Sequence, residues 1–455
     1  MSMRLIDSLA TTPDLSELFS DESMLRAMLD FESALARAEA RTGVIPKEAA
    51  DTITALAKPG SFDAAALSSA AFRAGTPAIP LVKALTDQVR QTNAEAARFV
   101  HWGATSQDVV DSAMSLLLKR AEPILIGDLL RLERALAGLS ERHKESVMVG
   151  RTLLQPAPPI TLGLKAAGWR ASVRRGRRRL QNGFRDAAVL QFGGATGTLA
   201  SLGHRGTAVI EALSMELGLK SASGAPWHTQ RDQLATLICA CGVLTGSLGK
   251  MARDIVLLMQ NEVGEASEPG GEGRGGSSTM PNKRNPTACS LTLAASYRVP
   301  GLVASFLSAM VQEHERGVGG WQAEWPVVAT VIQSTGVAIS SVAEVAEGLS
   351  VDEKRMRLNI ENTNGLIFAE RAMMLLGSKL GRDVAHKLLE GAARRSVNEN
   401  RNLAAVLAEM PEVTAQLSAA DLRQLGTPEQ YLGSAEAFRQ ALIAESGRED
   451  DDKEQ

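Results

Sequence analysis

The sequence predicts an all-α fold. Alanine and leucine are abundant, whereas aromatic residues make up 4% of the chain, and this balance favours helices over sheets. Long stretches with a helical pattern are the second observation, and uncharged runs within three of them are the third. The helical stretches cover about residues 106–143, 157–190, 228–262, 285–316 and 326–349.

Three helical domains are expected along the 455 residues. In the first, residues 1–105, Ser20 is a favourable N-cap for a helical pattern that stops at Thr42-Gly43, and shorter helical pieces follow. Residues 106–350 hold the long stretches and are expected to form a central helix bundle. Residues 351–455 are expected to form shorter helices and to end in a disordered acidic tail.

The three uncharged runs bear on membrane association. They cover residues 233–249, 299–312 and 325–343. The last run is long enough to suggest a membrane span, but it contains Gln333 and several hydroxyl-bearing side chains, and its flanking helices are charged. A helix that is apolar on all sides is also typical of the centre of a large bundle. We therefore expect these helices to pack at the centre of an oligomer, with no membrane role.

Composition argues against several other classes of protein. A net charge of −3 and a pI near 6.2 give no general affinity for nucleic acid or anionic membranes. The basic cluster at residues 170–179 lacks the interleaved aromatic residues of a polyanion site, so a solvated helix face with ion pairs explains it better. Cys239, Cys241 and Cys289 match no metal-binding pattern and suggest buried thiols in a reducing compartment. The N-terminus has no apolar signal-peptide core, so the cytoplasm is the expected location.

Residues 275–286 carry the most informative motif of the chain. They read Gly-Gly-Ser-Ser-Thr-Met-Pro-Asn-Lys-Arg-Asn-Pro, which is too rich in Gly and Pro for a helix. With the glycines upstream, the motif predicts a mobile catalytic loop over residues 264–285 that folds over a bound molecule and excludes water. Ser277, Lys283 and Asn285 would bring a hydroxyl, an ammonium group and an amide to that molecule. The alternative, a plain surface loop, gives no reason for this combination of side chains.

Two further segments carry polar groups at the start of predicted helices. Residues 101–108, His-Trp-Gly-Ala-Thr-Ser-Gln-Asp, open the first long helix, whose free N–H groups and positive dipole end suit a carboxylate. Thr105 and Asp108 also have the spacing of a capping box, so a purely structural role stays open. Residues 150–158, Gly-Arg-Thr-Leu-Leu-Gln-Pro-Ala-Pro, offer more polar contacts, with a polar turn before a Pro-initiated helix as the alternative.

These three segments, in this order, resemble the signature of the fumarase/aspartase superfamily, whose members cleave or form a C–O or C–N bond beside a carboxylate. The resemblance implies a homotetramer with the long helices at its core, in which each site draws the three segments from three subunits. It implies that Ser277 is the acid/base and that Lys283 and Asn285 stabilise developing negative charge. The resemblance also implies that the following residues bind substrate: Thr105, Ser106, Thr152, Gln155 and Ser278.

Two departures from the superfamily pattern narrow the chemistry. Relatives that expel an amine or water usually have His after the Thr and Glu seven residues after the loop Lys, whereas this chain has Leu153 and Ser290. An amine leaving group needs a proton, a water nucleophile must lose one, and such acid–base help is worth about 10²–10⁴ in rate. A carboxylate nucleophile needs neither, because it is already ionised at neutral pH. The missing pair therefore points to a carboxylate that attacks a double bond of the same molecule and closes a lactone.

Over most of the chain, further segments resemble the lactone-forming members of the superfamily. They lie at residues 43–46, 78–85, 191–199, 226–232, 271–276 and 312–325. The resemblance implies a small tricarboxylate as substrate, and the chemistry requires no cofactor and no metal. We expect Arg231, His314 and Arg316 to hold its carboxylates. Arg231 could instead form a structural salt bridge with Asp232 or another neighbour, and His314 could cap a helix C-terminus.

Three alternatives to a lactone-forming enzyme are another lyase, a structural protein and a nucleotide-binding module. The nearest rival is another superfamily lyase, acting on adenylosuccinate or argininosuccinate or releasing ammonia, and Leu153 and Ser290 argue against the first two substrates. A non-catalytic structural protein on the same helical scaffold would have no need of Ser277, Lys283 and Asn285. A nucleotide-binding module is excluded, because the sequence contains neither a Gly-x₄-Gly-Lys-Ser/Thr motif nor a strand-flanked Gly-x-Gly-x-x-Gly motif.

Overall fold

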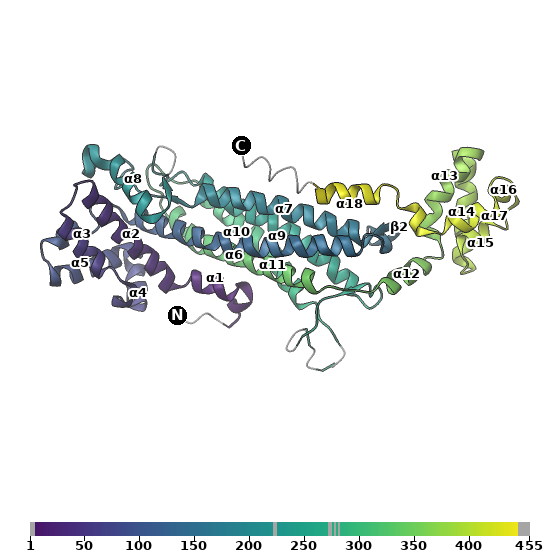
Figure 1. Ribbon diagram of the computed structural model, residues 1–455, viewed down its shortest axis with the longest axis horizontal. Helices are drawn as coiled ribbons and strands as arrows, with labels where there is room; N and C mark the ends of the chain where they lie inside the picture. The colour runs from purple at the N-terminus through teal and green to yellow at the C-terminus, as the bar shows by residue number, and fades with distance from the viewer. Residues whose placement is uncertain (1–4, 222–224, 272–274, 277–278, 281–282, 445–455) are drawn as a thin grey trace. The chain divides into compact units, whose positions relative to one another are not determined.

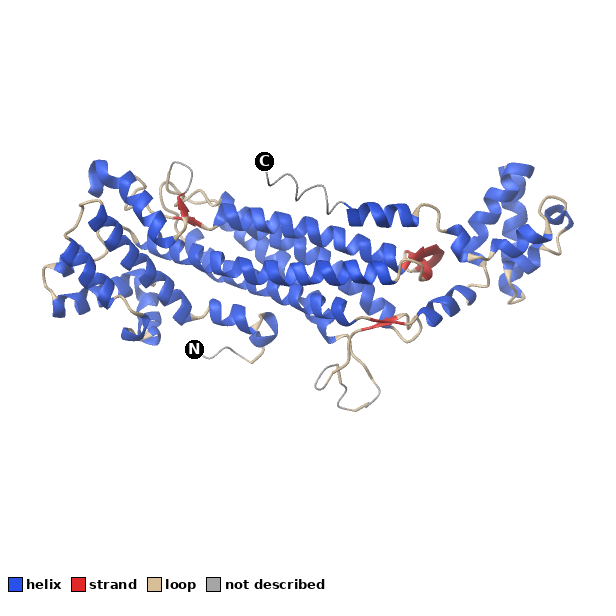
Figure 2. Cartoon of the chain, viewed as in Figure 1, coloured by secondary structure: helices blue, strands red, loops and turns tan. Residues whose placement is uncertain are grey.

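The computed structural model of the protein describes residues 5–221, 225–271, 275–276, 279–280 and 283–444. Within these residues the chain forms eighteen α-helices and three small two-stranded sheets (Figures 1 and 2). The prediction of an all-α fold is therefore confirmed. The predicted acidic tail, Ser277 and Ser278 lie outside the described residues.

Residue contacts divide the chain into two compact units. The first comprises Met1–Leu130, Arg175–Gly249 and Leu291–Ser341, and the second comprises Arg131–Arg174, Lys250–Ser290 and Val342–Gln455. The boundaries fall inside five long helices, so each of these helices contributes residues to both units. The expected division into three domains at residues 105 and 350 stays a prediction.

The N-terminal part of the first unit is a cluster of helices around α2. The Ser20 hydroxyl accepts the N–H of Ser23 at 3.2 Å, so the predicted N-cap of this helix is confirmed. Phe31 and Leu35 of α2 are fully buried in the core, and α2 packs against α3 and α8 (Figure 1). The helices here are α1 (Pro13–Leu18), α2 (Asp21–Arg41), α3 (Lys47–Leu56), α4 (Ala64–Ala74), α5 (Ala78–Thr92) and α8 (Gly206–Leu217).

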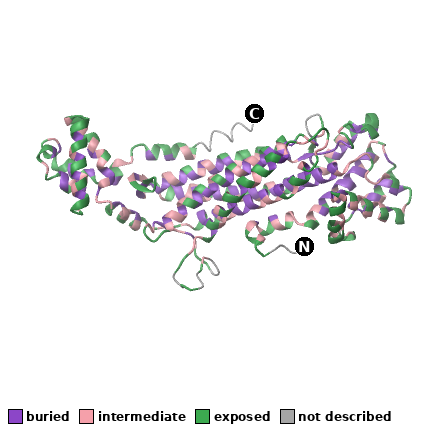
Figure 3. Ribbon diagram, turned by 180° about the vertical axis from the view of Figure 1, so that it is seen from behind, coloured by how far each residue is buried: buried purple, intermediate pink, exposed green. Residues whose placement is uncertain are grey.

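The five predicted long helices are all present. They are α6 (Ser106–Arg142), α7 (Leu162–Ala187), α9 (Asp232–Met259), α10 (Thr287–Ala309) and α11 (Gly320–Gly348). Figure 3 shows that buried residues follow these helices along their length. By length and composition α9 and α11 could cross a membrane, but 61% and 67% of the residues in their most apolar windows are buried within the chain. Such burial is typical of the core helices of a helix bundle.

A β-hairpin stands where the sequence predicts the start of a helix. Strands β1 (Val147–Thr152) and β2 (Gln155–Thr161) are antiparallel, and α7 begins at Leu162 rather than near residue 157. The prediction of helix over residues 157–161 is therefore wrong. Prolines in β2 cannot donate backbone hydrogen bonds, yet an edge strand tolerates them because one side of its backbone needs no partner. The Thr161 hydroxyl then accepts the N–H of Leu164 at 3.1 Å, which starts the helix.

Shorter helices make up the C-terminal part of the second unit, as predicted. They are α12 (Glu353–Glu361), α13 (Ala369–Leu380), α14 (Arg382–Asn398), α15 (Leu403–Leu407), α16 (Pro411–Thr414), α17 (Ala419–Leu425) and α18 (Ala435–Ala444). The remaining strands are β3 (Val189–Leu190) parallel to β4 (Lys220–Ser221), and β5 (Ala266–Ser267) antiparallel to β6 (Ser350–Val351).

Candidate active site

In the first unit, Asp108 organises the start of α6. Its buried carboxylate accepts backbone N–H groups of Thr105, Gly193 and Gly194 at 2.9–3.0 Å. The Nε2 atom of His228 lies 2.8 Å from Asp108 Oδ1. Four partners satisfy this carboxylate, so Asp108 joins the predicted 101–108 motif to two distant segments and is itself unavailable to a ligand.

Thr105 forms half of the capping box that its spacing predicts. Its N–H donates to Asp108 Oδ2 at 3.0 Å. Its hydroxyl accepts a hydrogen bond from Nη1 of Arg316 at 2.9 Å, so the structure brings two of the predicted binding residues together. Nη2 of Arg316 also donates to the carbonyl oxygens of Gly194 and Ala195, at 3.2 and 2.9 Å. Arg316 therefore ties the 312–325 segment to the start of α6.

His314 and Ser106 complete the predicted residues near this end of α6. His314 lies in the connection between α10 and α11, several residues beyond the end of α10 at Ala309, so it does not cap that helix. Its φ is 47°, its carbonyl oxygen accepts the Thr229 hydroxyl at 3.0 Å, and the residue is exposed. Ser106 is the first residue of α6 and is half-buried.

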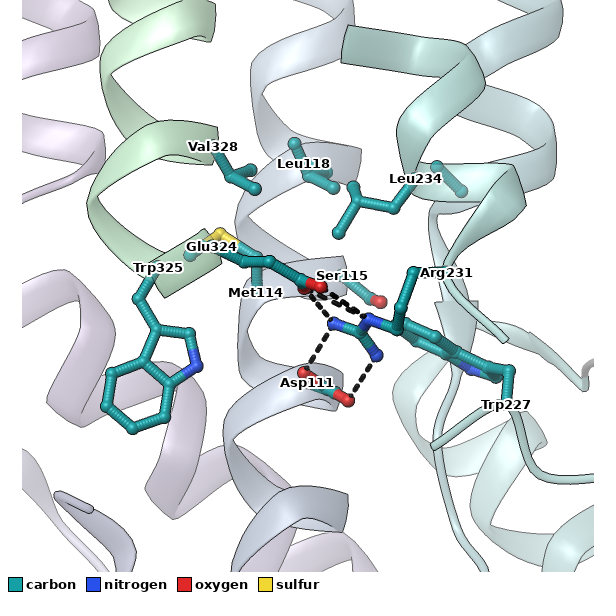
Figure 4. Close-up of a pocket in the computed structure, with 11 residues that line it drawn as sticks. Asp111, Met114, Ser115, Leu118, Trp227, Arg231, Leu234, Glu324, Trp325 and Val328 are labelled. Atoms are coloured by element: carbon teal, nitrogen blue, oxygen red, sulfur yellow. Dashed lines mark hydrogen bonds and ion pairs between the residues drawn. The ribbon is translucent and has the colours of Figure 1, made fainter. Parts of the chain in front are cut away.

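Arg231 lies in a buried pocket between two carboxylates (Figure 4). Nη1 and Nη2 donate to Asp111 at 2.8 and 3.2 Å, and Nε and Nη2 donate to Glu324 at 2.6–3.2 Å. The guanidinium carbon also lies 4.5 Å from the ring centroid of Trp227. Every nitrogen of the guanidinium is thus engaged and the side chain is 1% exposed. This geometry favours the structural alternative for Arg231, with Asp111 and Glu324 as its partners instead of Asp232.

The pocket around Arg231 holds two carboxylates and one guanidinium group. Burial and these charges shift the pKa values of Arg231 and Glu324. Burial alone would lower the pKa of Arg231, but the charges of Asp111 and Glu324 raise it above its usual value. Burial raises the pKa of Glu324 in spite of the opposing effect of the Arg231 charge. Trp321 Nε1 also donates to Asp111 at 3.0 Å and Gln312 Nε2 to Glu324 at 2.8 Å, which helps to stabilise the two buried carboxylates.

In the second unit, the tip of the β1–β2 hairpin presents Thr152 and Gln155. These residues face each other across a two-residue turn, and both are exposed. The turn residues Leu153 and Leu154 have φ values of 50° and 65°, as a type I′ turn requires. Leucine is strained in this left-handed region by about 1–2 kcal/mol per residue. The two leucines are nevertheless 96% and 72% exposed, so within one chain the tip has no packing that offsets this strain.

Arg151, which the sequence did not single out, fixes the hairpin to the first part of the 264–285 loop. It forms a bidentate ion pair with Glu265, with Nη2–Oε1 at 2.7 Å and Nη1–Oε2 at 3.0 Å. Asn359 Nδ2 donates to the same Glu265 at 2.8 Å, and the Glu265 side chain is fully buried. In the second motif, Arg151 therefore has a structural role, whereas the neighbouring Thr152 is exposed.

The loop places Lys283 and Asn285 along one cleft. The cleft has a volume of about 220 Å³, and its lining includes Glu268, Gly275, Lys283 and Asn285. Asn285 is held by two bonds, from its N–H to the Gly275 carbonyl at 2.9 Å and from Nδ2 to the Gly276 carbonyl at 3.3 Å. Lys283 is exposed, which leaves its ammonium group accessible to a bound anion. The predicted Ser277 and Ser278 lie outside the described residues.

Leu153 and Ser290, which replace the usual acid/base pair, offer no substitute for it. Leu153 has no titratable group. The Ser290 hydroxyl donates to the Pro286 carbonyl at 2.7 Å in the first turn of α10. Among the described residues no group of three or more His, Cys, Asp or Glu side chains has the geometry of a metal site.

Comparison with known proteins decides the family. A family model described as "Lyase" matches residues 8–301, and one described as "Adenylosuccinate lyase C-terminus" matches residues 365–442. The chain is 49% identical over 423 residues to 3-carboxy-cis,cis-muconate cycloisomerase of Bradyrhizobium diazoefficiens, which covers 93% of this chain and 94% of that protein. The chain belongs to the lyase family. Its membership confirms the predicted fumarase/aspartase superfamily and makes the protein an enzyme.

Two further comparisons place the chain within the lyase family. It is 48% identical to 3-carboxy-cis,cis-muconate cycloisomerase of Pseudomonas aeruginosa, over 97% of this chain and 96% of that protein. The crystal structure of 3-carboxy-cis,cis-muconate lactonizing enzyme from Pseudomonas putida matches with a TM-score of 0.92 at 44% identity, over 98% of this chain and 99% of that one. The likeness to these members of the lyase family therefore extends through both compact units.

Proposed function

We propose that this protein is a 3-carboxy-cis,cis-muconate cycloisomerase, which interconverts that tricarboxylate and carboxymuconolactone. The observation that carries the proposal is the replacement of the acid/base pair by Leu153 and Ser290 in a chain that is 46–49% identical to three such cycloisomerases. A carboxylate nucleophile needs no base, so this reaction does not need the missing pair. Such an enzyme would act in the breakdown of aromatic compounds through protocatechuate, in the cytoplasm.

The reaction then proceeds by intramolecular addition. An oxygen of one substrate carboxylate bonds to a carbon of the double bond, and the π electrons move to the neighbouring carbon and into the carboxylate beside it. Lys283, Asn285 and loop N–H groups stabilise this aci-carboxylate, an effect worth about 3–4 kcal/mol for one well-placed donor. Ser277 delivers the proton to the carbon and removes it in the reverse direction. A serine needs a lowered pKa for the reverse step, and we assign that effect to Lys283 and to the loop dipoles.

Substrate binding is assigned to the polar residues of the three motifs. In the first unit these are Thr105, Ser106, His314 and Arg316, and in the second unit Thr152, Gln155 and Ser278. Support comes from the contact between Arg316 and Thr105 and from the exposure of Thr152 and Gln155 at the hairpin tip. Arg231 is left out of this set, because its nitrogens are engaged by Asp111 and Glu324.

We also propose that the active form is a homotetramer with sites shared between subunits. A third or more of the apolar windows of α9 and α11 is not buried within one chain. Large apolar side chains on the long helices are exposed as well, among them Val243 and Leu307 at 53% and 43%. Such surface is costly in water and is typical of an interface that a partner covers.

One assay tests the activity directly. Purified protein without added cofactor should abolish the ultraviolet absorbance of the conjugated diene in 3-carboxy-cis,cis-muconate. Fumarate with ammonium, adenylosuccinate and argininosuccinate serve as parallel substrates, because an ammonia lyase (in its reverse, ammonia-adding direction), adenylosuccinate lyase or argininosuccinate lyase would act on one of them instead. Turnover of a succinyl conjugate with release of an amine, and none of the muconate, would overturn the proposal. Inactivity toward all four would also overturn the proposal and would point to another substrate.

A further inference from the structure

Glu268 fastens the two ends of the catalytic loop together. Its Oε1 accepts the backbone N–H of Cys289 at 2.7 Å, and its Oε2 accepts that of Ala288 at 3.1 Å. These N–H groups lie in the first turn of α10. The first N–H groups of a helix have no backbone carbonyl within the helix to accept their hydrogen bonds. Glu268 is 7% exposed and precedes Ala288 by 20 residues, so a buried side chain from the start of the loop caps the helix that follows the loop.

The residues on both sides of Glu268 are held by contacts with the rest of the second unit. The preceding strand β5 pairs with β6, with Ala266 opposite Val351 and Ser267 opposite Ser350. The following residue, Pro269, packs directly on Gly348 of α11, since a Cβ at that glycine would lie 2.7 Å from Pro269 Cβ. The carboxylate is therefore presented to α10 from a segment that is held on both sides.

The first turn of α10, which Glu268 caps, lies directly after the proposed catalytic residues Lys283 and Asn285. Asn285 lies three residues before Ala288, and its carbonyl accepts the Thr287 N–H at 2.9 Å. Its side chain and N–H bind the carbonyls of Gly276 and Gly275. Lys283 lines the same cleft as Glu268. A shift in the first turn of α10 would therefore move Asn285, three residues earlier, together with the backbone that carries Lys283.

We propose that Glu268 is a positioning residue for catalysis, which sets the place of Lys283 and Asn285 by capping α10. The inference rests on the proposed function only in taking those two residues as catalytic. It also has a consequence for binding. Because the α10 amides already hold a carboxylate, a substrate carboxylate in this cleft meets Lys283 and not the helix N-terminus. Misplacement of a catalytic group by about 1 Å costs about 10²-fold in rate, so loss of the cap should appear in kcat.

The test compares Glu268→Ala, Glu268→Gln and the control Glu262→Gln. Glutamine keeps the shape of Glu268, but an NH2 group, which cannot accept an N–H, replaces one of the two accepting oxygens. Glu262 is an exposed carboxylate six residues earlier in the same segment. Three quantities are measured well below the melting temperature of every variant: hydrogen exchange of the Ala288 and Cys289 amides, the rate of tryptic cleavage after Lys283 and Arg284, and kcat and KM with 3-carboxy-cis,cis-muconate.

We expect Glu268→Ala to exchange both amides at least about tenfold faster and to lose about 10²-fold in kcat, with KM within about threefold of the wild type. Tryptic cleavage should quicken as residues 283–284 lose their fixed position. Glu268→Gln should give amide exchange, cleavage and kcat values between those of Glu268→Ala and the wild type. If Glu268→Ala fails to fold, the Glu268→Gln values alone test the proposal. Glu262→Gln should match the wild type in all three measurements.

Two results would overturn the proposal. Unchanged amide exchange in both Glu268 variants would mean that the cap is absent in solution. Faster exchange with unchanged kcat and tryptic cleavage would reduce Glu268 to a structural helix cap. Exchange and cleavage need no substrate, so they judge the placement of residues 283–285 even if the wild-type protein ignores the muconate. A wild-type protein that does not turn over the muconate would refute the proposed function, but it would leave the proposed role of Glu268 in placing these residues to be judged by exchange and cleavage.

Discussion

Arg316 donates a hydrogen bond from Nη1 to the hydroxyl of Thr105 at 2.9 Å, across 211 residues of sequence. The hydroxyl therefore accepts from the guanidinium and keeps its own proton free to donate to a substrate carboxylate. The same guanidinium holds the carbonyls of Gly194 and Ala195, so one side chain fixes three segments around the start of α6. Arg316 thus organises this region in addition to its proposed contact with the substrate.

The first prediction concerns this arginine. Arg316→Ala should lower kcat/KM by about 10–100-fold, because hydrogen bonds to charged groups are worth about 1.5–3 kcal/mol. Arg316→Lys should recover part of the loss, since a lysine can reach some of the three acceptors but lacks the planar fork. Steady-state kinetics measures both. Arg26→Ala, which removes an exposed arginine that pairs with Glu22, is the control. Equal kinetics in all four proteins would separate Arg316 from the site.

The second prediction tests Arg231 as a structural residue. Arg231→Met leaves the carboxylates of Asp111 and Glu324 buried without their cation, and breaking such a pair costs about 3–5 kcal/mol. We expect a large fall in melting temperature, with KM close to the wild type when it is measured well below that temperature. A KM raised by about tenfold or more with little loss of stability would instead restore Arg231 as a carboxylate anchor.

Many of the helices could be predicted from the sequence because their signals are local. Ser20 supplies an N-cap and Thr42-Gly43 a stop, and the apolar spacing between them repeats with the period of a helix. The start of α6 at Ser106 follows from the same kind of signal. The hairpin could not be predicted in this way. Its turn is Leu153-Leu154, whereas the usual sequence signal for such a turn is Asn-Gly or Asp-Gly.

The motifs of the proposed site could be read from the sequence, but their contacts could not. Ser, Lys and Asn at fixed spacing mark the loop, because the proposed chemistry uses those groups. The partners of Arg231 are 120 and 93 residues away in the sequence, and no local pattern points to them. Glu268 lies 20 residues from the amide that it caps, so the usual capping-box spacing of three residues cannot reveal it. Contacts of this kind depend on the tertiary structure.

The third prediction is a pH dependence that arises from Glu39. This side chain is fully buried in α2, and neither carboxylate oxygen has a hydrogen-bond partner within the described part of the chain. Burial, with the nearby Glu32 charge, raises the pKa of Glu39 from 4.5 to about 9. Between these values the folded protein holds a proton that the unfolded chain releases. Stability should therefore fall as pH rises from about 5 to 9, by up to about 1.4 kcal/mol per pH unit.

The measurement is the difference in melting temperature between Glu39→Gln and the wild type across that pH range. Glutamine does not titrate, so the advantage of the variant should grow steadily with pH. Glu22→Gln, at an exposed position on the same helix, should show no such trend. A constant difference between pH 5 and 9 would mean that Glu39 is not the source of the pH dependence.

The fourth prediction concerns the proposed acid/base. Ser277→Ala should abolish turnover and leave the fold and the oligomer intact, because the change removes the proposed acid/base and only a single hydroxyl group. Activity, circular dichroism and light scattering are measured on the same samples. Retention of more than roughly a tenth of wild-type activity would refute this role, since acid–base catalysis is worth about 10²–10⁴ in rate.

The fifth prediction follows from the strained leucines at the hairpin tip. Leu153→Asn with Leu154→Gly supplies the residues that a type I′ turn prefers, so the turn itself should become more stable. If the tip packs against a neighbouring subunit, however, the variant removes two apolar side chains from that contact. Each fully buried leucine is worth about 1.5–3 kcal/mol, which exceeds the strain that the change relieves. We therefore expect weaker assembly and loss of activity at protein concentrations where the wild type is still active.

Light scattering and activity across a dilution series measure this effect. Met215→Thr, at an apolar residue on α8 that is 74% exposed, removes a comparable exposed side chain away from the tip and should leave both curves unchanged. A hairpin variant that assembles and turns over like the wild type would show that the tip faces solvent in the working enzyme. Thr152 and Gln155, which flank the same turn, would then lose their place in a shared site, because a solvent-facing tip cannot complete the active site of another subunit.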